Sequence, residues 1–169
     1  VFDVFLRANF ESKGGLGVYL TPNPVKQAMV EMAIHDLSGD DAFMARFSNG
    51  DFRFCDPTCG SFGFGSVALS QFDHLIDTQL VGLNDAEKQK LKQKIRDESL
   101  VGADAAPRMV MLARVNMALQ GAPKAKIFYT DNSLTAPALK PCSFDLICTN
   151  PPFGTPKFGN DKKGSESKK

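Results

Sequence analysis

Four consecutive residues, Asn150-Pro151-Pro152-Phe153, carry side chains that suit chemistry on an amino group. The amino group of adenine or of an amide has two N–H donors and a nitrogen lone pair delocalised into its π-system. A side-chain carbonyl and a backbone carbonyl that are held rigidly can accept both protons, which favours a more nucleophilic nitrogen. The prolines stiffen the loop, and a base stacked on Phe153 would gain ~1–3 kcal/mol. Consecutive prolines also occur in plain loops, so the tetrapeptide alone leaves that alternative open.

A second segment with chemical potential is the glycine-rich turn Asp-Pro-Thr-Cys-Gly-Ser-Phe-Gly-Phe-Gly at residues 56–65. Gly60, Gly63 and Gly65 would allow positive φ and a close approach of the backbone to a ligand. Their order matches neither the dinucleotide fingerprint nor the Walker A loop, and the nucleophile elbow also fails because Cys59 stands at its first glycine. Taken alone, this segment could equally be a tight turn without a ligand.

Polar residues follow four predicted strands in succession: Asp56, Asp104, Asp131 and Asn150. Ligands of open α/β sheets bind just beyond the carboxyl ends of the strands, so these side chains could line one crevice. One acid after a strand is usually a turn residue or a helix cap, but four in succession favour a site. Asp104 stands where an acid can bind the two hydroxyls of a ribose.

The elements that must position these residues alternate between strand and helix. We expect strands at residues 51–56, 100–104, 126–130 and 144–149, with helices between them. A helix including residues 67–69 follows the glycine-rich turn, and another opens at Pro107 and stops at Gly121. This alternation predicts one α/β domain with a parallel sheet and helices on its faces.

Two further helices carry recognisable start signals. The first begins with Asn23 as N-cap and Pro24 at the first helical position. We expect its buried face to contain the apolar residues that recur at helical spacing, namely Val25, Ala28, Met29, Met32 and Ala33. The second covers residues 84–98, where Asn84 and Glu87 have the spacing of a capping box and Leu91 and Ile95 supply a thin apolar stripe. Its lysines at positions 88, 90, 92 and 94 fit a solvated face better than a phosphate-binding one.

Composition limits the partners that this chain can bind. Its 169 residues are 43% hydrophobic and 23% charged, which is ordinary for a globular protein. No apolar run approaches the ~20 residues of a membrane helix, and the N-terminus lacks the features of a signal peptide, so we expect a cytoplasmic protein. The net charge of +1 is a poor footprint for duplex DNA. The four cysteines lack paired metal-ligand spacing, which favours free thiols over zinc.

Together these segments resemble the N6-adenine DNA methyltransferases, in particular the modification subunits of type I restriction systems. Residues 17–22, Gly-Val-Tyr-Leu-Thr-Pro, resemble the family's Tyr-x-Thr-Pro segment, and residues 56–61 resemble its motif Asp-Pro-x-Cys-Gly-Ser-Gly. Residues 102–107, followed by Leu112-Ala113 and Asn116, are similar to the ribose-binding motif and its helix. Residues 150–153 match the catalytic tetrapeptide, and Asp131-Asn132 lies where the family contacts the adenine ring of the cofactor.

The resemblance implies a three-layer Rossmann-like fold, direct methyl transfer from S-adenosylmethionine to adenine N6 of a flipped base, and no metal. Its implied catalytic residues are Asn150, Pro151, Pro152 and Phe153. Its implied cofactor-binding residues are Tyr19, Leu20, Thr21, Asp56, Thr58, Gly60, Ser61, Gly63, Asp104, Ala105, Asp131, Asn132 and Asn150. We expect a lead-in at residues 1–22, a cofactor-binding catalytic domain at 23–156 and a flexible polar tail at 157–169. The implied partners are DNA, bound weakly by this chain alone, a separate DNA-specificity subunit and a restriction subunit.

The chain departs from the family pattern in two places. Phe62 stands where the family has glycine, which would either crowd the cofactor or shift the role to Gly63. The sheet also looks truncated after its fourth strand, because family members have three further strands, so we expect a fragment. Two other functions stay open. Protein glutamine methyltransferases carry a similar loop, although Phe153 and the segment at 19–22 favour DNA, and a cofactor-binding module without activity is the other alternative.

Overall fold

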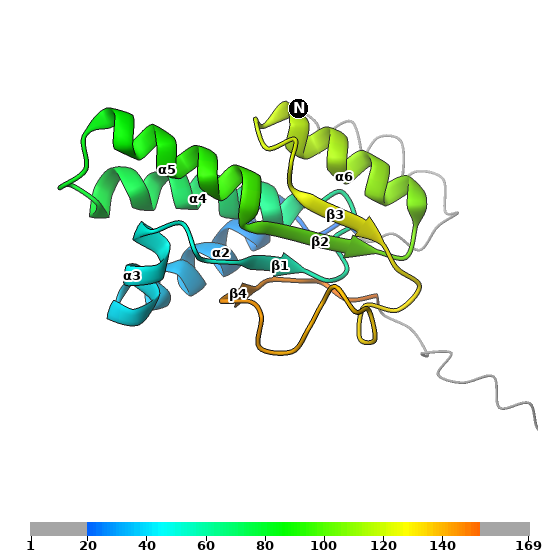
Figure 1. Cartoon of the computed structure of the whole chain (residues 1–169). Helices are drawn as coiled ribbons and strands as arrows, with labels where there is room; N and C mark the ends of the chain where they lie inside the picture. The colour runs from blue at the N-terminus through cyan, green and yellow to red at the C-terminus, as the bar shows by residue number, and fades with distance from the viewer. Residues whose placement is uncertain (1–19, 153–169) are drawn as a thin grey trace, which may run out of the picture.

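The computed structural model describes residues 20–152, and their strands form one parallel sheet with the order β3-β2-β1-β4 (Figure 1). The strands are β1 (Phe54–Asp56), β2 (Leu100–Asp104), β3 (Lys126–Tyr129) and β4 (Leu146–Ile147). Phe54 of β1 pairs with Leu100 of β2 and with Leu146 of β4, while Asp104 lies opposite Tyr129. All four carboxyl ends therefore point to the same edge of the sheet. The predicted α/β fold with a parallel sheet is confirmed.

Alternate strand residues face a core that the helices cover. Phe54, Leu100, Ile127 and Leu146 belong to one buried cluster with residues of every helix: α2 (Asn23–Ser38), α3 (Asp41–Ser48), α4 (Gly63–Gln79), α5 (Asp85–Glu98) and α6 (Pro107–Leu119). Phe72 of α4 stands at its centre, where its ring contacts those of Phe47, Phe52 and Phe54. In the described part of the chain, all helices thus pack on one face of the sheet.

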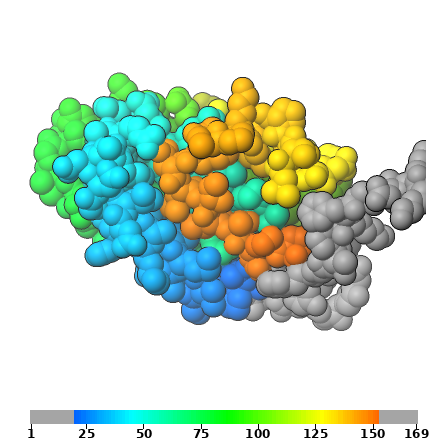
Figure 2. All heavy atoms as spheres, turned by 90° about the horizontal axis from the view of Figure 1, so that it is seen from below, coloured from blue at the N-terminus to red at the C-terminus, as the bar shows by residue number. Residues whose placement is uncertain are grey.

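The connection from β3 to β4 contains no helix between residues 131 and 145. The expected second layer of helices is therefore absent from the described residues. Figure 2 shows the segment around β4 (orange) on the surface, between α2 and α3 (blue and cyan) and the chain that follows β3 (yellow). No helix in residues 20–152 is long and apolar enough to cross a membrane.

The predicted start and buried face of the first helix were wrong. Pro22 is its N-cap, Asn23 already lies inside α2, and no side chain caps the helix. Val25, Met29 and Met32 are exposed, and the buried positions are Lys26, Val30 and Ile34. These form an equally regular helical stripe that packs against α4. The sequence pattern hid this stripe because a lysine can bury its long aliphatic stem although it counts as polar.

The signals of the charged helix α5 are confirmed. Asn84 Oδ1 accepts from the Glu87 N–H at 3.0 Å, and Glu87 Oε2 accepts from the Asn84 N–H at 2.8 Å, so both arms of the capping box are present. The stripe residues Leu91 and Ile95 are buried. Three of the four lysines bind within the chain: Lys92 pairs with Asp77 at 2.7 Å, Lys94 pairs with Asp51 at 2.9 Å, and Lys88 donates to the Asp77 carbonyl.

The first and the last of the four strands along the chain are shorter than predicted. β1 begins at Phe54 rather than at residue 51, and β4 comprises Leu146 and Ile147 only. Backbone pairing nevertheless continues on both sides of β4, since Asp145 N donates to Arg53 O at 2.9 Å and Cys148 N to Cys55 O at 3.2 Å. The chain is thus held in extended contact with β1 up to the residues just before Asn150.

Candidate active site

The glycine-rich turn after β1 is bonded to the end of β2. The Cys59 N–H donates to the Ala103 carbonyl and the Gly60 N–H donates to Asp104 Oδ2, both at 2.8 Å. The second carboxylate oxygen, Asp104 Oδ1, accepts from the Ala106 N–H at 2.8 Å, just before α6 begins. Asp104 is half-buried, and each of its oxygens has two lone pairs. Asp104 can therefore shape the turn and still accept hydrogen bonds from ribose hydroxyls.

Phe62 adopts a left-handed conformation, with φ 61° and ψ 42°, directly before α4. Its ring is fully buried, with its centroid 6.0 Å from that of Phe54. A Cβ on Gly65 would overlap this ring, and one on Gly102 would lie 3.1 Å from it. The ring thus occupies the space that two glycines leave and belongs to the buried core, so it does not extend toward the polar side chains at the strand ends.

Asp56 lies at the end of β1 and is 1% exposed, so it is buried beneath the residues that reach the surface at this edge of the sheet. Burial raises the pKa of Asp56 from 3.8 to about 7, hydrogen bonds from Thr149 and from the Thr58 backbone oppose this shift, and the nearby Asp104 charge adds to it. The hydroxyls of Thr58 and Thr149 are 2.6 Å apart. These contacts join the turn after β1 to the residue that precedes Asn150.

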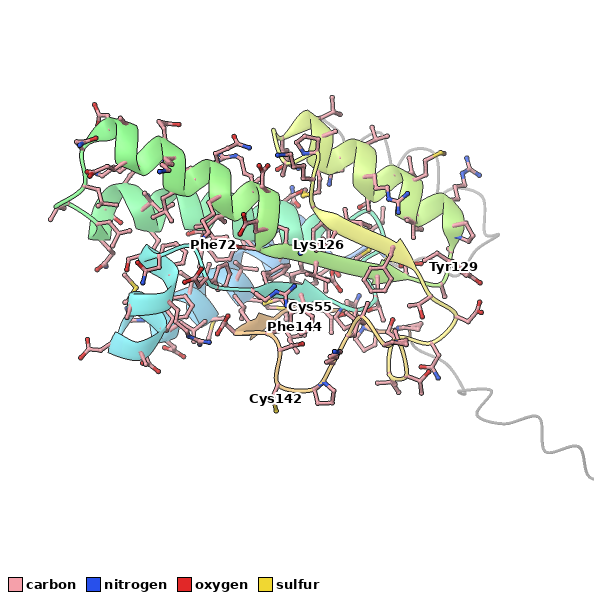
Figure 3. All side chains as sticks on the ribbon, viewed as in Figure 1. Cys55, Phe72, Lys126, Tyr129, Cys142 and Phe144 are labelled. Carbon is pink, nitrogen blue, oxygen red and sulfur yellow. The ribbon has the colours of Figure 1, made fainter. Side chains whose placement is uncertain are left out.

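Three cysteines, Cys55, Cys59 and Cys148, are buried close to Asp56, whereas Cys142 is exposed in the loop before β4 (Figure 3). Burial raises the pKa of Cys55 to about 12 and that of Cys148 to about 11, and in each case the Asp56 charge adds to the shift. The pKa of Cys59 rises for the same reasons. All four are free thiols, and the three buried ones are held in the unreactive protonated form.

Asn150 contacts the segment that precedes α2. Its Nδ2 donates to Thr21 Oγ1 at 3.1 Å, across 129 residues of sequence. Because Thr21 takes the nitrogen end of the amide, the carbonyl Oδ1 is the end that can accept from a substrate amino group. Pro151 and Pro152 are exposed beside it. Tyr19 and Phe153, the outer residues of these two motifs, lie outside the described residues.

The segment that follows β3, at residues 130–134, lies at the same edge of the sheet. Asp131 accepts a hydrogen bond from the Tyr129 hydroxyl, which raises the pKa of Tyr129 (Figure 3). Asn132 Oδ1 accepts from the Leu134 N–H at 3.0 Å, and Ser133 Oγ donates to the Pro57 carbonyl. Asp131 and Asn132 are exposed, so their side chains can be reached by a ligand.

The structure thus brings together most of the predicted residues through contacts that the sequence did not reveal. Ser133 and Thr149 bind Pro57 and Thr58 of the glycine-rich turn. No local sequence pattern indicated a role for either residue. The buried Lys26 was also missed, although its ammonium reaches Gly63, where a Cβ would lie 2.5 Å from Nζ. The burial of Lys26 could have been predicted only if this charged residue had been assigned to the same helical stripe as Val30 and Ile34.

Comparison with known proteins agrees with this arrangement. A sequence model of the family described as N-6 DNA Methylase matches residues 1–169. The chain belongs to the N-6 DNA methylase family. The match spans the whole chain and favours DNA over the protein-glutamine alternative. The matched range includes the glycine-rich turn at residues 56–65 and the tetrapeptide at residues 150–153.

Relatives of this N-6 DNA methylase chain include a type II methyltransferase, M.MamI, from Microbacterium ammoniaphilum, which is 31% identical over 163 residues. The methylase subunit of the type I restriction enzyme EcoEI from Escherichia coli is 28% identical over 167 residues. These matches cover 93% and 98% of the chain but only 40% and 28% of the relatives. The chain therefore spans less than half the length of either relative.

A solved structure shares the fold. It is assigned as a modification subunit of a type I restriction enzyme from Vibrio vulnificus YJ016, with a TM-score of 0.59 and 26% identity. The match covers 91% of this chain and 28% of the solved one. The parallel sheet and its helices are thus similar to one part of a larger modification subunit.

Proposed function

We propose that residues 23–156 form the cofactor-binding and catalytic unit of an S-adenosylmethionine-dependent enzyme that methylates adenine N6 in DNA. The observation that carries the proposal is the contact between Asn150 and Thr21, at the edge of the sheet where Gly60 is bonded to Asp104. The contact between the hydroxyls of Thr58 and Thr149, beside Asn150, and the membership of the N-6 DNA methylase family both support this proposal.

The proposed cofactor roles are those that the resemblance to the family implies, and the exposure of the residues supports them. The carboxylate of Asp104 accepts the ribose hydroxyls, and the exposed Asp131 and Asn132 bind the adenine ring. Ala105, which is also exposed, belongs to the same group of cofactor-binding residues. The turn residues Thr58, Gly60, Ser61 and Gly63 bind the methionine portion, as do Leu20 and Thr21 on the opposite side. Tyr19 joins this group by its position next to Leu20. Asp56 stabilises the turn from below.

The catalytic residues prepare the substrate amino group. When bound, S-adenosylmethionine supplies an electrophilic methyl group on a positively charged sulfur. Asn150 Oδ1 and the Pro151 carbonyl accept the two N–H groups of the target adenine, which directs the nitrogen lone pair toward the cofactor side. Pro151 and Pro152 hold those acceptors in place, and Phe153 stacks on the extruded base.

The proposed partners follow from charge and from the relatives. DNA is the substrate, but the net charge of +1 gives this chain a weak hold on it. One relative is described as a methylase subunit of a type I restriction enzyme, so we include a separate DNA-specificity subunit and a restriction subunit among the partners. A DNA substrate also favours the cytoplasm as the compartment.

Calorimetric titration of the whole chain with S-adenosylmethionine tests the cofactor, with ATP and NAD as controls. Selective binding of S-adenosylmethionine is the expected result. Equal binding of all three compounds, or binding of none of them, would contradict the proposal. If the cofactor binds, incubation with an adenine-containing duplex and a glutamine-bearing peptide identifies the methyl acceptor, and we expect label on the duplex alone.

A further inference from the structure

A group of polar side chains, made up of the buried Asn116 and the half-buried Ser66 and Gln120, lies behind the glycine-rich turn and joins it to α6. Asn116 is 5% exposed, and its Nδ2 donates to the Ser61 carbonyl and to Ser66 Oγ, both at 2.9 Å. Gln120 Nε2 donates to Asn116 Oδ1 at 2.9 Å and to Ser66 Oγ at 2.6 Å. Ser66 Oγ in turn donates to the Phe62 carbonyl at 3.3 Å.

Both polar atoms of the Asn116 amide have hydrogen-bond partners in this network. An asparagine side chain has two N–H donors and one carbonyl. Here the donors serve Ser61 and Ser66, and the carbonyl serves Gln120. This favours one arrangement of the turn over others, because breaking a bond to the buried Asn116 amide leaves a buried polar atom unpaired.

This network fixes the direction of two successive peptide groups in the turn. The carbonyl and the N–H of a trans peptide point in opposite directions. With its carbonyl held by Asn116, the Ser61–Phe62 peptide points its N–H at the Cys59 carbonyl, 2.7 Å away. With the Phe62 carbonyl held by Ser66, the N–H of Gly63 points out of the N-terminus of α4, where helical N–H groups have no acceptor within the helix.

The geometry points to Asn116 as a positioning residue of the cofactor site: it holds Ser61 and Phe62 so that the turn is shaped for the ligand before the ligand binds. This inference rests on the proposed function, because the ligand concerned is S-adenosylmethionine. It adds a residue that lies on another helix, 55 positions from Ser61, and that is buried behind the turn. The gain in affinity comes from preorganisation, since an ordered turn pays no ordering cost on binding.

Hydrogen exchange of the ligand-free chain tests the positioning directly. Asn116→Asp keeps the size and the acceptor for Gln120 but replaces both donors, and Asn116→Leu removes them without adding charge. Val110→Ala is the matched control, because Val110 is buried on the same helix and its truncation leaves a cavity in the core. We expect exchange in residues 60–66 to speed up by about tenfold or more in both Asn116 variants but not in Val110→Ala. Unchanged exchange there in either folded Asn116 variant would overturn the inference.

Cofactor titration separates this inference from the function on which it rests. We expect the Asn116 variants to bind S-adenosylmethionine about tenfold more weakly than the wild type, well below their melting temperatures, and Val110→Ala to bind normally. Wild-type binding with equal affinity in the Asn116 variants contradicts the positioning role. Absence of binding by the wild type contradicts the proposed function, and the exchange measurement then still decides whether Asn116 orders the turn.

Discussion

At the scale of single residues, the carboxyl groups of Asp56 and Asp104 lie at the ends of neighbouring strands but have different surroundings. Asp104 is half-buried and accepts two backbone N–H groups, from Gly60 and Ala106. Asp56 is almost fully buried and borders Thr58 and Thr149. We therefore expect substitution of Asp104 to affect mainly ligand binding, and substitution of Asp56 to affect mainly how the stability of the chain depends on pH.

Substitution of Asp104 separates its effect on the ligand from its effect on the turn. Asp104→Ala removes the ribose acceptor, and we expect it to weaken S-adenosylmethionine binding by roughly 1.5–3 kcal/mol. Asp104→Asn retains one carbonyl acceptor, so the expected loss is smaller. Calorimetric titration measures both, with Asp97→Asn as the control because Asp97 pairs with Lys124 on the surface. Wild-type affinity in Asp104→Ala would sink the ribose assignment.

Asp56 makes the stability of the chain depend on pH. Its pKa is raised from 3.8 to about 7, so between these values the folded state binds a proton that the unfolded state has released. The contribution of Asp56 to the free energy of unfolding therefore falls as the pH rises from about 4 to about 7, by up to about 4 kcal/mol. Asp56→Asn removes the charge and should remove this dependence.

Thermal melting of the wild type and Asp56→Asn at pH 5 and pH 8 measures the effect. We expect the substitution to raise the melting temperature more at pH 8 than at pH 5. All other titratable groups are the same in both proteins, so the difference between the two isolates Asp56. An equal difference at both pH values would show that the carboxyl group is ionised throughout.

At the scale of elements, the turn between β1 and α4 is stabilised by packing as well as by hydrogen bonds. Phe62 takes a left-handed conformation that costs an ordinary residue roughly 1–2 kcal/mol. Its ring is buried against Gly65 and Gly102, where larger residues would not fit. The burial of the ring offsets the backbone cost, so a phenylalanine is stable at a position that favours glycine.

Phe62→Gly tests which of these effects is larger. The substitution relieves the backbone strain but deletes a fully buried ring, and truncating a core phenylalanine to alanine costs about 3–5 kcal/mol. We expect a net loss of stability of ~2–4 kcal/mol in urea unfolding. A variant as stable as the wild type would mean that the ring contributes nothing to the fold.

The elements also show how far the sequence predicts this structure. Local signals were sufficient for α5, where the capping box involves residues three apart, and for the polar ends of the strands. They failed for α2, where two stripes had helical spacing and only the contact with α4 selects the one that contains Lys26. The direction of the Phe62 ring could not be predicted either, because it depends on Gly102, which lies on a different strand. The contacts of Ser133 and Thr149 likewise depend on how the strands are ordered.

At the scale of the whole molecule, charge is distributed unevenly along the chain. Residues 157–169 contain five lysines against Asp161 and Glu166, whereas the chain as a whole carries a net charge of +1. The remaining residues are therefore net acidic, which opposes binding of the phosphate backbone. Any affinity of the isolated chain for DNA should then depend on the C-terminal segment rather than on the proposed active site.

Fluorescence anisotropy with a labelled duplex tests this distribution. For the whole chain we expect non-specific binding only, with a dissociation constant in the range of about 10⁻⁴–10⁻⁶ M that weakens steeply with salt. Deletion of residues 157–169 should abolish this binding, since it removes the excess of positive charge, while the affinity for S-adenosylmethionine stays unchanged because none of the proposed cofactor-binding residues is lost. Sequence-dependent binding by the shortened chain would contradict the proposal that recognition comes from a separate subunit, since the acidic remainder would then read bases by itself.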